Sequence, residues 1–198
     1  MNIIATDLEK KINSELGTKV KSSAIKHQQI YITINIDDLV DVATLLKTNQ
    51  KLKFKQLIDI TAVDYPSNEK RFKIVYFLLS HEFNQRIIIS SFINDNEQVE
   101  TLTNIFPSAN WMEREVFDMY GVVFKNHPDL RRILTDYGFE GHPLRKDFPT
   151  TGFLEVRYDE VEKRVIYEPT TLTQGYRDFD FLSPWDNPGV YTNTDTKD

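Results

Sequence analysis

The sequence of 198 residues contains no cysteine. Disulfides, thiolate nucleophiles, cysteine-based zinc sites and cysteine-ligated iron–sulfur clusters are therefore excluded within this chain. Basic residues are not in excess either, because 24 lysines and arginines stand against 30 acidic residues, for a net charge of −6. The chain lacks the excess of positive charge that would neutralise phosphates, so we expect no nucleic-acid binding.

Long apolar runs are also missing. The longest, at residues 74–79, is far shorter than the roughly 20 residues that a membrane-spanning helix needs. The start, MNIIATDLEKKINSELG, has acidic residues where a signal peptide has a basic and then an apolar segment. We therefore expect no direct membrane span and a soluble chain that faces the cytosol.

Apolar residues recur at helical spacing in four stretches, which predicts helices over residues 6–16, 38–46, 96–106 and 110–120. Strand patterns occupy four others: QIYITINI, FKQLIDITAVDY, FKIVYFLL and RIIISSFI. Short, turn-rich connections between the last three favour hairpins. The fold class that follows is α+β, with helices packed on one face of a mostly antiparallel sheet and an extended C-terminal arm behind it.

Three regions differ in composition and in the pattern of their apolar residues. Residues 1–124 form the predicted α+β domain. Residues 125–149, called the signature segment below, are rich in proline and glycine, and we expect only short helical turns there, starting after Pro128. Residues 150–198 carry five of the six excess negative charges and read as an extended acidic arm, with one strand in YDEVEKRVIYEP. Its isolated aromatic residues need a pocket on this domain or on another subunit, and the candidates for docking are Phe179, Phe181 and Trp185.

The stretch NWMEREVFDMYGVVFKNHPDLRRIL combines carboxylates with arginines. Glu113, Glu115 and Asp118 could serve as acid and base, since two carboxylates in different environments can divide these roles. The alternative is an internal paired network, because residues 113–147 hold seven acidic and six basic side chains. Near-balanced charge beside large apolar residues favours the network. A stand-alone hydrolase that uses Glu113 and Glu115 is the less favoured hypothesis.

Two histidines in this region, His127 and His142, each precede a proline, Pro128 and Pro143. Their spacing matches no metal-binding motif, so we interpret them as turn or capping residues. The basic clusters DLRRIL and HPLRKDFP are interleaved with aspartates, which favours internal pairing or a partner protein over lipid headgroups.

The blocks EREVFDMYGVVFKNHPDLRRIL and DYGFEGHPLRKDFP closely resemble the C-subunit family of the proton-pumping NADH:quinone oxidoreductase, respiratory complex I, which in mitochondria is the iron-sulfur protein 3 subunit. The matching positions that we interpret as structural or as subunit interface are Glu113, Arg114, Glu115, Asp118, His127, Pro128, Arg131, Arg132, His142, Pro143, Arg145, Lys146 and Asp147.

This resemblance implies a subunit without a cofactor of its own, in the quinone module of the peripheral arm, which supports electron transfer from NADH to quinone coupled to proton translocation. Its implied partners are the large D subunit and the neighbouring iron–sulfur subunits, and FMN, the clusters and quinone are expected in partner subunits. The implied location is the cytoplasmic side of the cell membrane, as a peripheral part of a membrane complex. The equivalent subunit of a membrane-bound hydrogenase or of another quinone-linked dehydrogenase is the alternative that the motifs leave open.

Overall fold

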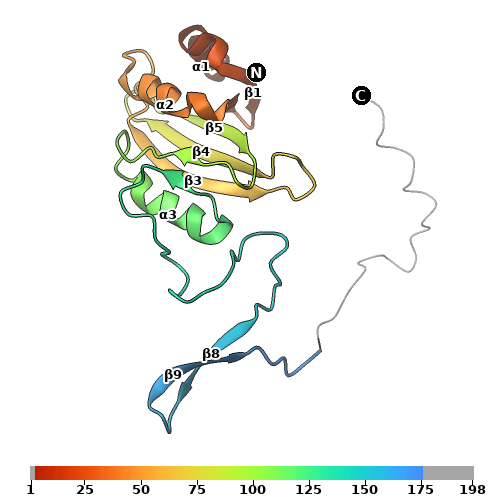
Figure 1. Ribbon diagram of the computed structural model, residues 1–198. Coiled ribbons are helices and arrows are strands. Elements are labelled where there is room, and N and C mark those ends of the chain that lie inside the picture. Colours follow the sequence, from red (N-terminus) through yellow and green to blue (C-terminus); the bar gives the residue numbers. More distant parts are fainter. Residues whose placement is uncertain (1–2, 176–198) are drawn as a thin grey trace, which may run out of the picture. The chain divides into compact units, whose positions relative to one another are not determined.

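The computed structural model describes residues 3–175 (Figure 1). The chain divides into two compact units, residues 1–152 and 153–198. The signature segment belongs to the first unit and follows its last helix. The predicted docking aromatics Phe179, Phe181 and Trp185 lie outside the described residues.

The first unit is built on a five-stranded sheet with the strand order β1-β2-β5-β4-β3. In chain order the strands are β1 (Val20–Lys26), β2 (Gln29–Ile34), β3 (Gln56–Asp64), β4 (Phe72–Ser80) and β5 (Gln85–Ile93). Neighbouring strands are antiparallel except β2 and β5, which pair in parallel and are not joined by a hairpin. The predicted α+β class with a mostly antiparallel sheet is confirmed.

Strand β1 lies at one edge of the sheet and was not predicted. Its sequence, VKSSAIK, has no clear apolar alternation, and most of its side chains are exposed or half-buried. It pairs with β2 through a tight turn in which His27 and Gln28 both have positive φ, 49° and 65°. Such turns usually carry asparagine or glycine, so the sequence lacked the expected turn signal.

Three helices of the first unit supply the other side of the core: α1 (Ile3–Leu16), α2 (Leu39–Thr48) and α3 (Ala109–Tyr120), with short 3-10 turns at Gly17–Lys19 and Ile36–Asp38. Their buried side chains and one set of alternate strand residues belong to a single apolar cluster. The helices therefore pack on the same face of the sheet, as predicted, and α3 lies along β3 (Figure 1).

Burial along β4 shows how this core is made. Phe72, Ile74, Tyr76 and Leu78 are almost completely buried and alternate with half-buried residues on the opposite face. Because side chains of a strand alternate between faces, one face is sealed by the helices and the other is left open. Each fully buried large apolar side chain stabilises the fold by about 1.5–3 kcal/mol relative to exposure.

The prediction of a helix over residues 96–106 is wrong. Residues Val99–Glu100 form strand β6, which pairs in parallel with β7 (Phe124–Lys125). The N–H of Val99 donates to the carbonyl of Val123, and the N–H of Thr101 donates to that of Lys125. These amides are therefore bonded to a segment that follows α3. Only one helical turn remains in residues 96–106, where the N–H of Phe106 donates to the carbonyl of Leu102.

The described part of the second unit is a hairpin of β8 (Leu154–Asp159) and β9 (Arg164–Pro169), where the sequence predicted one strand. The Asp159 carboxylate accepts the N–H groups of Val161 and Glu162, which makes the turn between the strands. In residues 3–175, no helix has both the length and the apolar character that crossing a bilayer requires.

Gly121, which ends α3 with φ of 79°, offers a test of the local packing. A Cβ at this position would lie 2.6 Å from both the Arg145 guanidinium and the His142 ring. Gly121→Ala should therefore combine backbone strain with displacement of two held side chains, at a cost of more than about 2 kcal/mol in the free energy of unfolding.

Gly17→Ala is the matched control, because Gly17 also has positive φ but a Cβ added there would meet no atom within 4 Å. It should cost only the backbone strain, about 1–2 kcal/mol. Urea unfolding of the two variants measures the difference, and equal losses would show that the contacts around Gly121 contribute nothing.

Candidate functional site

Asp118, in the last turn of α3, has a completely buried side chain. Its Oδ2 accepts the successive N–H groups of Ile133, Leu134 and Thr135 at 3.0, 2.8 and 2.9 Å. Its Oδ1 accepts the Arg132 guanidinium at 2.7 Å and the Thr135 hydroxyl. One carboxylate thus determines the path of the chain at residues 132–135.

Burial by itself raises the pKa of Asp118, because it disfavours the charged form. The hydrogen bonds from Thr135, Leu134 and Arg132 lower it by more, so the pKa lies well below its usual range. Asp118 is therefore ionised throughout the physiological range, and its charge is compensated inside the protein.

Arginines complete the attachment of this segment to α3. The Arg132 guanidinium also donates to the carbonyl of Gly141 at 2.9 Å and lies over the Phe139 ring. Arg114 donates to the carbonyls of Arg131 and Arg132 at 3.0 and 3.1 Å. These bonds hold an irregular backbone. After Pro128 the signature segment contains isolated hydrogen-bonded turns, as at His142–Arg145, and no helix.

His142 packs against the end of α3. Burial lowers its pKa, which favours the neutral ring. Its Nδ1 lies 2.9 Å from the Asp118 carbonyl oxygen, which can only accept, so Nδ1 carries the proton. Arg145 donates to the carbonyl of Tyr120 at 2.6 Å. His142 and Arg145 therefore both lie against Gly121 at the end of α3.

A second buried carboxylate, Asp64 at the end of β3, holds the far end of the signature segment. Arg71 donates two bonds to it, at 2.7 and 3.0 Å, and the N–H of Lys146 donates a third at 2.8 Å. The Arg71 guanidinium also pairs with Asp147 at 3.0 Å. The bonds from Arg71, assisted by that from Lys146, lower the pKa of Asp64 despite its burial.

Asp64, Arg71 and Asp95 were not among the predicted site residues. Asp95 accepts the Arg145 guanidinium at 2.9 Å and lies 3.5 Å from that of Arg71, so it joins the two arginines. The signal for Asp64 was present in the sequence, because it occupies an inward position of an alternating strand, two residues after the buried Ala62. A charge at such a position requires a buried partner.

Glu113 differs from these two aspartates because none of the arginines in residues 3–175 pairs with it. Its fully buried carboxyl accepts the N–H of Leu102 at 2.7 Å and the Thr101 hydroxyl at 2.5 Å. It therefore joins α3 to the end of β6 and does not cap its own helix. Burial raises the pKa of Glu113 to about 7, and the two hydrogen bonds offset only part of that effect.

His127 lies next to this carboxyl, with its Nε2 3.9 Å from the Glu113 Oε2. The N–H of Asp129 donates to His127 Nδ1 at 3.0 Å, so Nδ1 is unprotonated. The proton is on Nε2, which donates to the carbonyl of Asn110 at 3.1 Å. These bonds define a neutral ring that caps the turn at residues 127–129, so His127 does not compensate the Glu113 charge.

The hydrolase hypothesis required Glu113 and Glu115 to share a water-accessible cleft. Glu113 is completely buried, whereas Glu115 is exposed on the same helix. Residues two apart on a helix do not face each other, so the buried Glu113 and the exposed Glu115 do not share the water-accessible cleft that the hypothesis requires. Among residues 3–175, no group of three or more potential ligands could hold a metal ion.

The described residues thus define an α+β protein. Its buried carboxylates Asp64, Glu113 and Asp118, with the groups that bind them, are called the charged motif below, and they connect α3, the ends of β3 and β6, and the signature segment. Residues 32–154 match the family described as respiratory-chain NADH dehydrogenase, 30 Kd subunit. This match includes all of the charged motif. The chain belongs to this family.

Relatives named as the C subunit of NADH-quinone oxidoreductase extend the likeness over nearly the whole chain. The protein from Chelativorans sp. is 48% identical over 197 residues, which is 100% of this chain and 98% of that protein. The protein from Ruegeria pomeroyi is 49% identical over 97% of this chain and 98% of its own length.

Two solved structures share the fold. One, from the membrane-bound sulfane sulfur reductase, an archaeal respiratory membrane complex, is 26% identical with a TM-score of 0.62 and covers 73% of this chain and 85% of its own. The other, the trypsin-resistant fragment (1-134) of Nqo5, is 23% identical with a TM-score of 0.52 and covers 62% of this chain and 98% of that one.

Replacing Asp118 tests whether its carboxylate holds the signature segment. Asp118→Asn removes the charge that compensates Arg132 and places an amide near several donors, so the free energy of unfolding should fall by on the order of 3 kcal/mol or more. Hydrogen exchange should also accelerate at the amides of Ile133, Leu134 and Thr135.

The control is Glu115→Gln, an exposed change on the same helix, which should alter stability by less than about 0.5 kcal/mol. A similarly small effect of Asp118→Asn, with unchanged amide exchange, would contradict the assignment.

The raised pKa of Glu113 predicts a pH dependence of stability. The folded state binds this proton more tightly than the unfolded chain, whose carboxyl has a pKa near 4.5, so stability falls as pH rises from about 4.5 through about 7. Glu113→Gln, which resembles the protonated acid, should match the wild type near pH 4.5 and exceed it by on the order of 3 kcal/mol at pH 8. Urea unfolding across this range measures the difference, and parallel curves would contradict it.

Proposed function

We propose that this chain is a structural subunit, without a cofactor of its own, of an NADH:quinone oxidoreductase of the complex I type. In this role it holds the quinone module together, so that electron transfer from NADH to quinone can be coupled to proton translocation. Its partners are the large D subunit and the neighbouring iron–sulfur subunits, which with the rest of the complex supply FMN, the clusters and quinone. It is a peripheral component on the cytoplasmic side of the membrane.

The observation that carries this proposal is the near 50% identity, over almost the full length of both chains, to proteins named as the C subunit of NADH-quinone oxidoreductase. The likeness to a subunit of a different respiratory complex is much lower, at 26% identity. The alternative of an equivalent subunit in a hydrogenase-type complex is therefore not favoured.

The geometry of the charged motif supports a structural role. Its three buried carboxylates accept hydrogen bonds from other parts of the same chain: Asp118, Asp64 and Glu113. A backbone held in this way carries exposed apolar side chains, notably Leu134 (63% exposed) and Tyr137 (87% exposed). An ordered backbone suits a permanent contact, because little backbone freedom is lost on binding.

The absence of a cofactor in this subunit is tested on the purified full chain. We expect no bound flavin, no iron and no NADH oxidation when the chain is alone. Isolation of the membrane complex with this chain as bait, followed by identification of its components, should recover the large D subunit together with flavin and iron–sulfur subunits. Bound flavin or iron in the isolated chain would contradict the proposal.

Truncation after Gly152, the boundary between the two compact units, tests the second unit and the arm as a docking element. The shortened chain should bind the large D subunit at least about 10-fold more weakly, because the aromatic residues of the arm are lost as contacts. Its thermal unfolding should still be cooperative, since the sheet and the charged motif are complete within residues 1–152. Unchanged binding in a pull-down would count against the docking role.

A further inference from the structure

The face of the sheet opposite the helices carries a stripe of apolar side chains among polar ones, which include Lys73, Thr33 and Ser90. Along β4 the outward residues Val75, Phe77 and Leu79 are half-buried, and Ile88 lies beside Phe77 on β5. Ile88 does not belong to the apolar cluster that includes all three helices, which places it on the other side of the sheet. Solvated faces of antiparallel sheets usually point polar residues outward, so the contiguous apolar stripe along β4 favours a contact.

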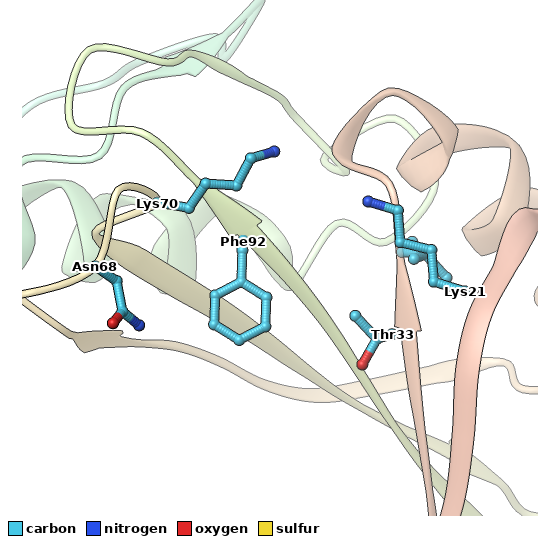
Figure 2. A pocket seen from close by; sticks show the side chains of 6 residues that line it. Lys21, Thr33, Asn68, Lys70 and Phe92 are labelled. Carbon is cyan, nitrogen blue, oxygen red and sulfur yellow. The ribbon is translucent and has the colours of Figure 1, made fainter.

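A pocket of about 340 Å³ lies at one end of this face (Figure 2). Its lining comes from β1, β2, β5 and the turn before β4, and consists of Lys21, Thr33, Ile34, Asn68, Lys70 and Phe92. Figure 2 shows the Lys21 and Lys70 side chains extending toward one another, with Phe92 below Lys70 and Thr33 below Lys21. A third ammonium group, on Lys73, lies 5.5 Å from the centre of the Phe92 ring.

The charge of this pocket is unbalanced. No carboxylate of the described residues lines it, although the chain as a whole has a net charge of −6. Some other lysines pair with acids, as Lys19 does with Asp41 and Lys51 with Glu15. Within residues 3–175, neither Lys21 nor Lys70 has an ion-pair partner. Two unpaired cations beside an aromatic ring can receive a carboxylate next to an apolar side chain.

We infer that this open face is a docking surface for a neighbouring subunit that presents an acidic residue beside apolar or aromatic side chains. The carboxylate lies between Lys21 and Lys70, and the apolar side chains cover Phe92 and the stripe along β4. This inference rests on the proposed function, because it requires a partner protein. A second copy of the chain is disfavoured, since a two-fold contact would bring the same lysines together.

Zero-length crosslinking in the assembled membrane complex tests the occupant directly. A carbodiimide joins lysines to carboxylates in contact, so Lys21 or Lys70 should be linked to an aspartate or glutamate of another subunit. Links that lead only to acids of this chain's own arm, or to a second copy, would overturn the inference. So would equal modification of both lysines by an amine-reactive reagent in the complex and in the isolated full chain.

A charge-reversal variant gives an independent readout. Full-length chain carrying both Lys21→Glu and Lys70→Glu should bind its partner subunits at least about 10-fold more weakly, with an unchanged unfolding temperature. Lys26→Glu is the matched control, because this exposed lysine lies on the same strand, β1, but does not line the pocket, and it should bind like the wild type. Equal binding of the double variant and the control would refute the inference.

The two proposals fail in different ways. Absence of this chain from any complex with flavin and iron–sulfur subunits contradicts the proposed function. Its presence there with both lysines freely reactive contradicts only the docking surface.

Discussion

Five hydrogen bonds converge on the buried carboxylate of Asp118, and the path of the signature segment across the end of α3 depends on them. Three of the donors are successive backbone N–H groups, which point at one oxygen only when the chain turns around it. Without these donors the desolvation of the charge would cost several kcal/mol. The buried charge and the irregular segment therefore stabilise each other, and neither is favourable alone.

A buried carboxylate also holds the other end of the signature segment, where Asp64 accepts hydrogen bonds from Arg71 and from the N–H of Lys146. Glu113 differs from both aspartates, because its neighbours are a hydroxyl, an amide and a neutral histidine. Two carboxylates thus keep a fixed charge at all physiological pH values, and the third binds or releases a proton within that range. The motif combines a permanent framework with one pH-sensitive contact between α3 and β6.

The framework leaves apolar side chains exposed on the first unit, among them those of the signature segment and of the sheet. The signature segment exposes Leu134 and Tyr137, and the sheet exposes the face that the helices do not cover. A protein that functions alone gains nothing from such surfaces, which favour association with other chains. Membership in a family of respiratory-complex subunits and the position of these surfaces are therefore mutually consistent.

Periodicity predicted much of the fold, because burial imposes it on the sequence. The alternating residues of β2 and the helical spacing in α1, α2 and α3 each reflect one buried face. Strand β1 was not predicted because it lies at an edge of the sheet and none of its side chains is buried. The apolar residues of 99–106 do recur at helical spacing, but their amides bond to β7, and no local pattern records a partner that distant.

For the site, composition and motif resemblance alone were enough to exclude cysteine chemistry, to predict a balanced charge network and to indicate the family. The tertiary structure alone decided which donor binds each acidic side chain. Glu113 and Glu115 are two residues apart and differ completely in burial, whereas Asp64 and Lys146 are far apart in the chain and share a hydrogen bond. Sequence patterns report the burial of each position, but the pairing of charges depends on how distant segments are brought together around a common core.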